Sequence, residues 1–356
     1  MKKLILTCCF PITIFSQIDS NRINQYLDSV MQSRNIPGLS IAVIKEKKVV
    51  FESEKGLSNV ELNAKVTKSS VFELASLTKP FTGVAILKLV SQGKVNLDHS
   101  ISKYIDSIPN QWNTITIKNL LNHTSGLPEQ VVLSHGFSPV MDVSTKEQFE
   151  LIKEKALEFI PNDKGLYSDP GYFLLGMIIE KVSNKTYAQF MQSEIFEPIG
   201  MLQTQIQDKW KIISNRVSAY GYNRGMLING RRDYQHELPS HYGVLSTIAD
   251  LIKWDNALRD YKIINKKLLD ESFKPSLISN GDKNEIWGSN YGYGWMLGEL
   301  KGRLYAEHGG FSGTHLIHFI DKDLTVIVLT NLDLRSKSNP RGIAHYIAGF
   351  FLEESD

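Results

Sequence analysis

Ser76 and Lys79 are the residues whose types and spacing first suggest chemistry in this sequence. They stand where a segment of helical periodicity begins, with a mostly apolar face formed by Phe81, Val84, Ala85, Leu87 and Val90. Because positions three apart share one face of a helix, we expect the two side chains to point into the same space. A hydroxyl beside an amine provides a nucleophile and a base when burial or a neighbouring charge keeps the amine neutral.

The backbone around Ser76 suits the same chemistry. A helix N-terminus offers free N–H groups to a developing oxyanion. Pro80 has no N–H to donate to the carbonyl of Ser76, so we expect an irregular or 3₁₀-like first turn.

The Ser-x-x-Lys spacing alone is weak evidence, because it also occurs at 91–94 and 100–103. The second occurrence contains Gly93 where the helix should end, and the third follows a polar turn. Only the first precedes a long apolar face. The structural alternative for Ser76 is a helix N-cap with a solvated lysine one turn later.

Tyr167, in the loop Tyr167-Ser168-Asp169 before a predicted helix, is a candidate partner for the lysine. A tyrosine can shuttle or stabilise the proton of a base if a nearby cation lowers its pKa. Tyr-x-Asp also occurs at Tyr26 and Tyr104, so placement rather than spacing singles out Tyr167. The alternative is a tyrosine packed at a helix entrance with Asp169 as the N-cap.

The segment from His308 to Gly313 lies between two predicted strands and contains Gly309 and Gly310. Glycines beside a strand let a substrate approach closely, and the N–H of Phe311 is a candidate oxyanion donor. A phosphate cradle is disfavoured because neither a lysine nor a helix follows. His315 and His318 would face opposite sides of a strand, so we expect core or edge histidines and no metal site there.

The first sixteen residues have the character of a cleavable export signal. A basic start at Lys2 and Lys3 precedes a short apolar stretch, and small Ser16 follows it. The stretch is too short to span a membrane. A lipoprotein signal at Cys8 or Cys9 is disfavoured because few apolar residues precede them. The alternative to a cleavable signal is a frayed apolar N-terminus or a retained anchor.

Composition narrows the function classes further. Both cysteines lie in the predicted signal, so the remaining chain has no disulfide, catalytic cysteine or thiolate metal site. The 40 basic and 38 acidic residues become 38 of each without Lys2 and Lys3, which is a net charge of zero. A neutral chain argues against nucleic acid or an anionic membrane as the main partner.

The periodicities predict an α+β fold within the broad α/β class, with one sheet built from both chain ends and a mostly helical insertion. We expect a hydrolase domain over 17–356, with a sheet region at 17–95 and 285–356 and a helical region at 96–284. Two long stretches, 130–142 and 202–243, have no regular period and are expected to govern substrate choice. Helices are predicted at 19–34, 115–121, 145–159, 172–182, 187–196, 246–258, 265–273 and 340–352, and strands at 39–44, 49–52, 293–297, 304–307, 316–319 and 325–329.

Taken in chain order, Ser76-x-x-Lys79, Tyr167-x-Asp169 and His308-x-Gly310 resemble the serine β-lactamase and penicillin-recognising enzyme superfamily. The stretches 120–127 and 243–247 support a resemblance to its class C, esterase and D-peptidase branch over nearly the whole chain. The resemblance implies an antiparallel sheet flanked by helices, an acylated Ser76, and general base and acid work shared by Lys79 and Tyr167. It also implies an oxyanion hole from the N–H groups of Ser76 and Phe311, and no cofactor or metal. Which of Lys79 and Tyr167 takes the serine proton stays open.

Two positions depart from the family pattern. Asp169 replaces an asparagine, and an ionised aspartate only accepts hydrogen bonds, so it could hold Lys79 as a cation and favour Tyr167 as the base. His308 replaces the lysine of Lys-Thr-Gly, and a histidine with the usual pKa of about 6.5 is mostly neutral at pH 7. Losing a charge-assisted hydrogen bond to a substrate carboxylate is worth about 1–2 kcal/mol.

We therefore expect an exported serine hydrolase that acts on an ester, an amide or a D-residue peptide. A β-lactamase or DD-carboxypeptidase is the alternative within hydrolases, and a slowly acylated sensor of cell-wall fragments is the alternative outside them. An α/β-hydrolase is disfavoured because no Gly-x-Ser-x-Gly elbow is present. The expected partner is a small molecule or peptide, without nucleic acid or a stable membrane anchor, and the oligomeric state stays open.

Overall fold

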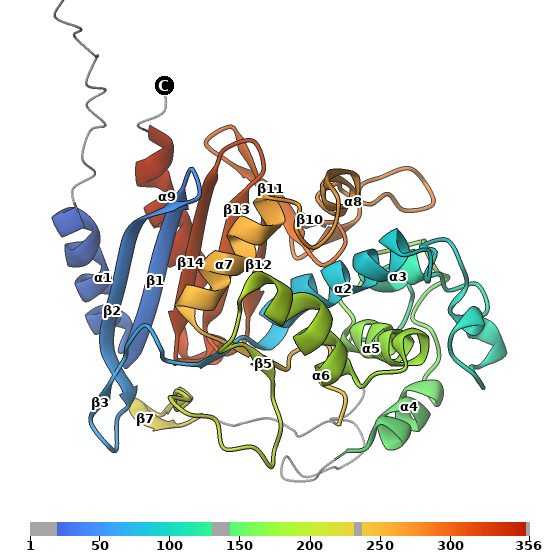
Figure 1. Ribbon diagram of the computed structural model, residues 1–356, viewed down its shortest axis with the longest axis horizontal. Coiled ribbons are helices and arrows are strands. Elements are labelled where there is room, and N and C mark those ends of the chain that lie inside the picture. The colour runs from blue at the N-terminus through green and yellow to red at the C-terminus, as the bar shows by residue number, and fades with distance from the viewer. Residues whose placement is uncertain (1–19, 130–142, 231–236, 354–356) are drawn as a thin grey trace, which may run out of the picture.

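An antiparallel sheet built from both ends of the chain forms the centre of the computed structural model (Figure 1). The structure describes residues 20–129, 143–230 and 237–353, so the predicted export signal at 1–16 and the stretch 130–142 lie outside the described residues. The strands are β1 (Gly38–Lys45), β2 (Lys48–Asn59), β3 (Ala64–Lys65), β9 (Glu285–Ile286), β10 (Ser289–Tyr291), β11 (Met296–Leu300), β12 (Arg303–Gly310), β13 (Thr314–Phe319) and β14 (Leu324–Thr330). Their spatial order is β3-β2-β1-β14-β13-β12-β11-β10-β9, so β1, from the start of the chain, pairs with β14, from its end.

Both faces of the sheet are buried at β1, and the alternation along this strand shows why. Ile41 and Val43 join a core with α1 (Ser20–Arg34) and α9 (Pro340–Glu353), whereas Ala42 and Ile44 join the larger core on the opposite face. Figure 1 shows α1 and α9 on one side of the sheet and the remaining helices on the other. The predicted fold class, an antiparallel sheet flanked by helices, is confirmed.

The larger core continues into the mostly helical region. Its helices other than α2 begin with polar side-chain caps, and three capping boxes pair Thr116 with Asn119, Ser144 with Glu147 and Thr186 with Gln189. None of the described helices is long and apolar enough to cross a bilayer. The helices are α2 (Lys79–Ser91), α3 (Ile117–Leu121), α4 (Thr145–Lys153), α5 (Asp169–Ser183), α6 (Tyr187–Phe190), α7 (Ile248–Arg259) and α8 (Lys266–Ser272).

Two small sheets complete the described structure. β4 (Phe72–Glu73), β8 (Val244–Ser246) and β5 (Gln205–Ile206) form the first, in the order β4-β8-β5, and β6 (Tyr220–Asn223) pairs with β7 (Met226–Asn229) in the second. Three of these strands lie in the stretch 202–230, which showed no regular period in the sequence.

The predicted helix at 145–159 is wrong beyond Lys153. The chain leaves the helix there because the N–H of Glu158 donates to the carbonyl of Gly126 at 2.7 Å. The contact is close, since a Cβ on Gly126 would lie 2.2 Å from the carbonyl oxygen of Phe159. Tertiary hydrogen bonding therefore overrides local helix propensity.

Two other predicted elements differ from the structure in their bounds. The helix at 187–196 becomes a π-type turn over Met191–Phe196. The strand predicted at 293–297 begins only at Met296, because Gly294 turns with a φ of +87° against the backbone of Lys79.

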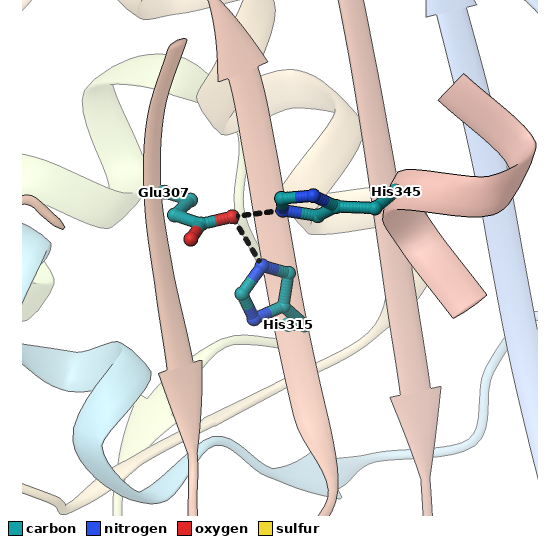
Figure 2. A group of neighbouring side chains, drawn as sticks. All are labelled: Glu307, His315 and His345. Atoms are coloured by element: carbon teal, nitrogen blue, oxygen red, sulfur yellow. Dashed lines mark hydrogen bonds and ion pairs between the residues drawn. The ribbon is translucent and has the colours of Figure 1, made fainter. Parts of the chain in front are cut away.

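A buried carboxylate joins α9 to the sheet on the face away from α2. Glu307 of β12 accepts hydrogen bonds from His315 of β13 at 3.0 Å and from His345 of α9 at 2.6 Å (Figure 2). Arg341 donates to its other oxygen at 2.7 Å. Burial alone would raise the pKa of Glu307, but the charges and hydrogen bonds of the two histidines lower it well below its usual range.

We predict that Glu307→Gln destabilises the protein by about 3 kcal/mol at pH 7, because one carboxamide cannot accept from both histidines and Arg341. The measurement is urea unfolding at pH 7 and at pH 3, with the exposed Glu299→Gln as the control. A carboxylate whose pKa is lowered on folding stabilises above its unfolded value of 4.5 and loses this effect as the pH falls. The two stability curves should therefore converge in acid, and a constant difference at both pH values would contradict the prediction.

Candidate active site

Ser76 lies in a short strained turn between β4 and α2. Ala75 has a φ of +48°, a left-handed conformation that costs a non-glycine residue about 1 kcal/mol. Residues Ala75–Thr78 then form a 3₁₀ turn, in which the N–H of Lys79 donates to the carbonyl of Ser76. The irregular first turn expected from Pro80 is confirmed, and it leaves Ser76 partly exposed.

Lys79 is completely buried, and its amine is surrounded by acceptors. Nζ lies 2.7 Å from Oδ1 of Asp169, 3.2 Å from the carbonyl oxygen of His241 and 3.4 Å from Oγ of Ser76. Burial lowers the pKa of this amine, and the charge and hydrogen bond of Asp169 oppose that shift. The predicted meeting of Ser76 and Lys79 on one side of the helix is confirmed.

Tyr167 covers the lysine. The amine lies 4.5 Å from the centre of its ring, and the tyrosine hydroxyl hydrogen-bonds Ser76. Burial, followed by the negative charge of Asp169, raises the pKa of this hydroxyl well above its usual value. The tyrosine therefore carries its proton in the resting state.

Asp169 is the first residue of α5 and does not cap it. Ser168 is the N-cap, because its hydroxyl accepts from the N–H of Gly171 at 3.2 Å. The alternative in which Asp169 caps the helix is wrong. Its carboxylate faces Lys79 instead, which is the pairing expected from the aspartate at this position.

His308 is a buried, neutral residue whose two ring nitrogens are both engaged. Nδ1 lies 2.8 Å from the carbonyl oxygen of Gly309, which only accepts, so Nδ1 carries the proton. Nε2 therefore accepts from the hydroxyl of Tyr291 at 3.1 Å. Burial and then the charge of Lys79 lower the pKa of His308 to about 3. It offers a substrate neither a cation nor a free ring N–H.

The turn after β12 is fixed against the segment that precedes Ser76. Thr314 donates to the carbonyl of Leu74 at 2.9 Å, and Ser312 donates to the carbonyl of Glu73. A Cβ on Gly310 would lie 1.9 Å from the oxygen of Leu74, so only glycine permits this approach. The same turn carries Phe311, and it therefore joins the two segments whose N–H groups are the oxyanion candidates.

Gly309 and Gly310 thus allow close packing within the protein itself. A Cβ on Gly309 would lie 2.9 Å from Nδ1 of His315, on the face away from His308. The sequence predicts that glycines beside this strand make room for a substrate backbone. The close neighbours in the structure are other parts of the same chain.

Two parts of the site were not singled out from the sequence. His123 accepts from the N–H of Ser168 at 3.0 Å, and its carbonyl accepts from the N–H of Leu166, so it holds the loop that carries Tyr167. Its ring lies 4.5 Å from that of Tyr167. The carbonyl of His241, which receives the Lys79 amine, is the second. A lone histidine after a helix gives little signal, and a backbone carbonyl gives none.

One group of described residues has ligand atoms close enough to hold a metal ion, and it lies behind the site. Atoms of Glu307, His315 and His345 lie within 4.8 Å of one another. Arg341 already neutralises the carboxylate, and both histidines donate to it, so the group is satisfied without a cation. His318 faces the other side of the sheet and pairs with Asp255 of α7 at 2.6 Å, as expected for neighbours on opposite faces.

The stretch 202–243 contributes to a hollow that lies apart from this chemistry. A cavity of about 1370 Å³ is lined by parts of α4 and α6 and by residues 202 and 204–211, and its lining includes none of the predicted site residues. Among the described residues of this stretch, 202–230 and 237–243, the carbonyl of His241 contacts the amine of Lys79. The role of 202–243 in substrate choice stays a prediction.

Comparison with known proteins places this geometry in a family. Penicillin-binding protein 4* of Bacillus subtilis is 30% identical over 308 residues, which cover 80% of this chain and 65% of that protein. The chain thus spans just under two thirds of the length of this curated relative. The octameric penicillin-binding protein homologue from Pyrococcus abyssi has a TM-score of 0.81 and 27% identity, covering 94% of this chain and 78% of that one.

The D-amino acid amidase from Ochrobactrum anthropi SV3 shares the fold, with a TM-score of 0.81 at 23% identity, over 94% of this chain and 99% of that one. A family model described as Beta-lactamase matches residues 23–347, which include the turn at Ser76, the loop that carries Tyr167 and the turn that carries Phe311. This chain belongs to the Beta-lactamase family.

Proposed function

We propose that this protein is a serine hydrolase that forms an acyl-enzyme on Ser76 and acts on an ester, an amide or a D-residue peptide. The observation that carries the proposal is the fully buried amine of Lys79, which contacts the Ser76 hydroxyl and the Asp169 carboxylate together. A solvated lysine beside a helix cap would not be desolvated in this way.

The proton path follows from the charges around Lys79. Burial disfavours the ammonium, so its proton passes to Asp169 when a substrate excludes water, and a neutral amine remains beside Ser76. The amine takes the serine proton as Oγ attacks the carbonyl carbon. Tyr167, whose raised pKa keeps it protonated, gives its proton to the departing oxygen or nitrogen and is reprotonated from Lys79. We therefore assign the base to Lys79 and the acid to Tyr167. This reverses the expectation that Asp169 favours Tyr167 as the base, because the raised pKa of Tyr167 makes it a poor base.

The remaining steps use the backbone and water. The negative oxygen formed by the attack is stabilised by the N–H groups of Ser76 and Phe311, which the glycine turn brings together. Water then attacks the acyl-enzyme by the reverse proton path and releases Ser76.

The state of His308 supports esters, amides and D-residue peptides over penicillins. A neutral histidine with both nitrogens engaged provides no charge-assisted bond for a carboxylate. Hydrolysis of a β-lactam or removal of a terminal D-residue is the second candidate, favoured by the relative named as a penicillin-binding protein. A non-turnover sensor is disfavoured because Ser76, Lys79 and Tyr167 are in contact.

We also propose that the protein is exported. The basic and apolar start of the chain would direct it out of the cytoplasm before cleavage near Ser16. The substrate would then be a small molecule or peptide outside the cytoplasm, and the neutral charge of the remaining chain is consistent with this.

Ser76→Ala is expected to abolish covalent labelling by a fluorophosphonate and the hydrolysis of short-chain esters, because the nucleophile is lost. Intact-protein mass spectrometry measures the adduct. Ser91→Ala, at the second Ser-x-x-Lys, is the matched control and should label like the wild type. Equal labelling of the Ser76→Ala variant and the wild type, or no labelling of either, would contradict the assignment of Ser76.

Asp169→Asn is expected to move the whole pH profile of kcat/KM to lower pH, by about one unit. The carboxylate opposes deprotonation of Lys79 and raises the pKa of Tyr167, so its removal lowers the pKa of both groups. The acidic limb follows the base and the alkaline limb follows the acid. The exposed Asp106→Asn should leave the profile in place, and an unmoved profile in Asp169→Asn would refute the pairing.

His308→Lys is expected to raise the rate of acylation by carboxylate-bearing β-lactams roughly tenfold, because it adds a cation where the wild type has a neutral ring. His308→Gln adds no charge and should bring no gain. Stopped-flow acylation measures the effect, and thermal melting checks that both variants are folded. Equal acylation rates in a folded His308→Lys and the wild type would end the argument against penicillins.

A further inference from the structure

We infer that Trp287 forms a binding subsite for a flat apolar leaving group of the substrate, beside Tyr167. This inference rests on the proposed hydrolase function, because it places the indole next to the proton donor of the acylation step. The leaving group would be an aromatic or similarly planar apolar alcohol or amine.

The backbone at Trp287 does not favour a tryptophan. Trp287 and Gly288 form the two-residue turn between β9 and β10, with φ values of +52° and +77°. Two left-handed residues define a type I′ turn, for which Asn-Gly is the preferred sequence. A bulky side chain in this conformation is a strained exception, so local folding does not account for the residue.

Burial does not account for it either. Trp287 is 66% exposed, whereas Trp112, Trp254 and Trp295 are almost completely buried. Its indole centre lies 4.5 Å from the ring centre of Tyr167, with 34° between the planes. The indole thus contacts the catalytic tyrosine and leaves most of its surface to solvent.

A single exposed aromatic residue is ordinarily unremarkable, and Trp210 is an example. Trp210 is 83% exposed, and its φ is not left-handed. Its ring lies under the amine of Lys209, away from the acylation chemistry. Trp287 differs from it in backbone conformation and in its contact with the site.

The arms of the turn hold the indole in a fixed place. Ile286 and Tyr291 pack with Tyr167 in one small buried cluster. The hydroxyl of Tyr291 also bonds His308 at 3.1 Å. The hairpin is therefore attached to the site on its buried side, and Trp287 lies at its exposed tip against the tyrosine.

The contact with Tyr167 indicates which part of the substrate the indole meets. In the proposed acylation Tyr167 gives its proton to the departing atom, so the group attached to that atom lies nearest to Tyr167. A planar apolar leaving group would cover the exposed indole and remove both surfaces from water, and aromatic pairs add stabilisation beyond burial.

The experiment compares benzyl acetate with ethyl acetate, which share an acyl group and have alcohols of similar acidity. Trp287→Asn is expected to lower kcat/KM for the benzyl ester about tenfold relative to the ethyl ester, and Trp287→Phe should restore most of that ratio. The deacylation rate should stay unchanged, because the leaving group has already departed. The melting temperature of Trp287→Asn should equal or exceed that of the wild type, because Asn-Gly suits the turn.

An unchanged ratio of the two esters in Trp287→Asn would overturn the subsite. Equal losses for both esters together with a lower melting temperature would also overturn it, because they would show a structural role. The proposed function is tested separately by fluorophosphonate labelling of Ser76. Labelled enzyme with an unchanged ester ratio rejects only the subsite, whereas absent labelling and absent ester hydrolysis reject the hydrolase proposal.

Discussion

A desolvated amine is the feature on which the rest of this structure depends. Lys79 has lost its water and must be satisfied by the three oxygens that surround it, from Ser76, Asp169 and His241. Those oxygens come from three separate segments of the chain. Each segment must therefore be placed to a fraction of an ångström before burial of the amine becomes tolerable. The fold positions these three segments around the amine of Lys79.

Close backbone contacts provide this accuracy. Gly83 and Gly294 let the chain pass against α2, where an added Cβ would meet carbonyl oxygens at 2.9 and 3.0 Å. Gly310 does the same at the segment before the nucleophile. Ala75 and His123, near the same site, adopt left-handed backbone conformations that are strained for residues other than glycine. Strain of this kind persists only where the surroundings determine the conformation, and here the surroundings are the site.

Local chemistry explains why the contact between Ser76 and Lys79 and the fold class were predictable. Ser76 and Lys79 are neighbours on one turn, so their meeting follows from spacing and from the apolar face behind them. The sheet was predictable because alternating and continuous apolar runs stood at both chain ends. Tyr167 and His308 were found by their place between regular elements, and the pairing of Asp169 with Lys79 by the charge of an unexpected residue.

The features that were not predicted depend on contacts between residues that are far apart in the sequence. The end of α4 is decided by the carbonyl of Gly126, and the network around Glu307 needs His345 of the last helix. The role of His123 follows from a hydrogen bond across 45 positions. No local pattern contains this information, because each partner is ordinary in its own segment.

The pairing of β1 with β14 has a consequence for the order of events during synthesis. Leu39 pairs with Thr330, so the sheet cannot be completed until nearly the whole described chain has left the ribosome. Pairings of such long sequence separation form slowly. The turn at Ala75–Thr78 also lacks its neighbour until Gly310 arrives, because Gly310 and Thr314 lie against the carbonyl of Leu74. The turn after β12 and the segment before Ser76 therefore come into contact only in the step in which the sheet becomes compact.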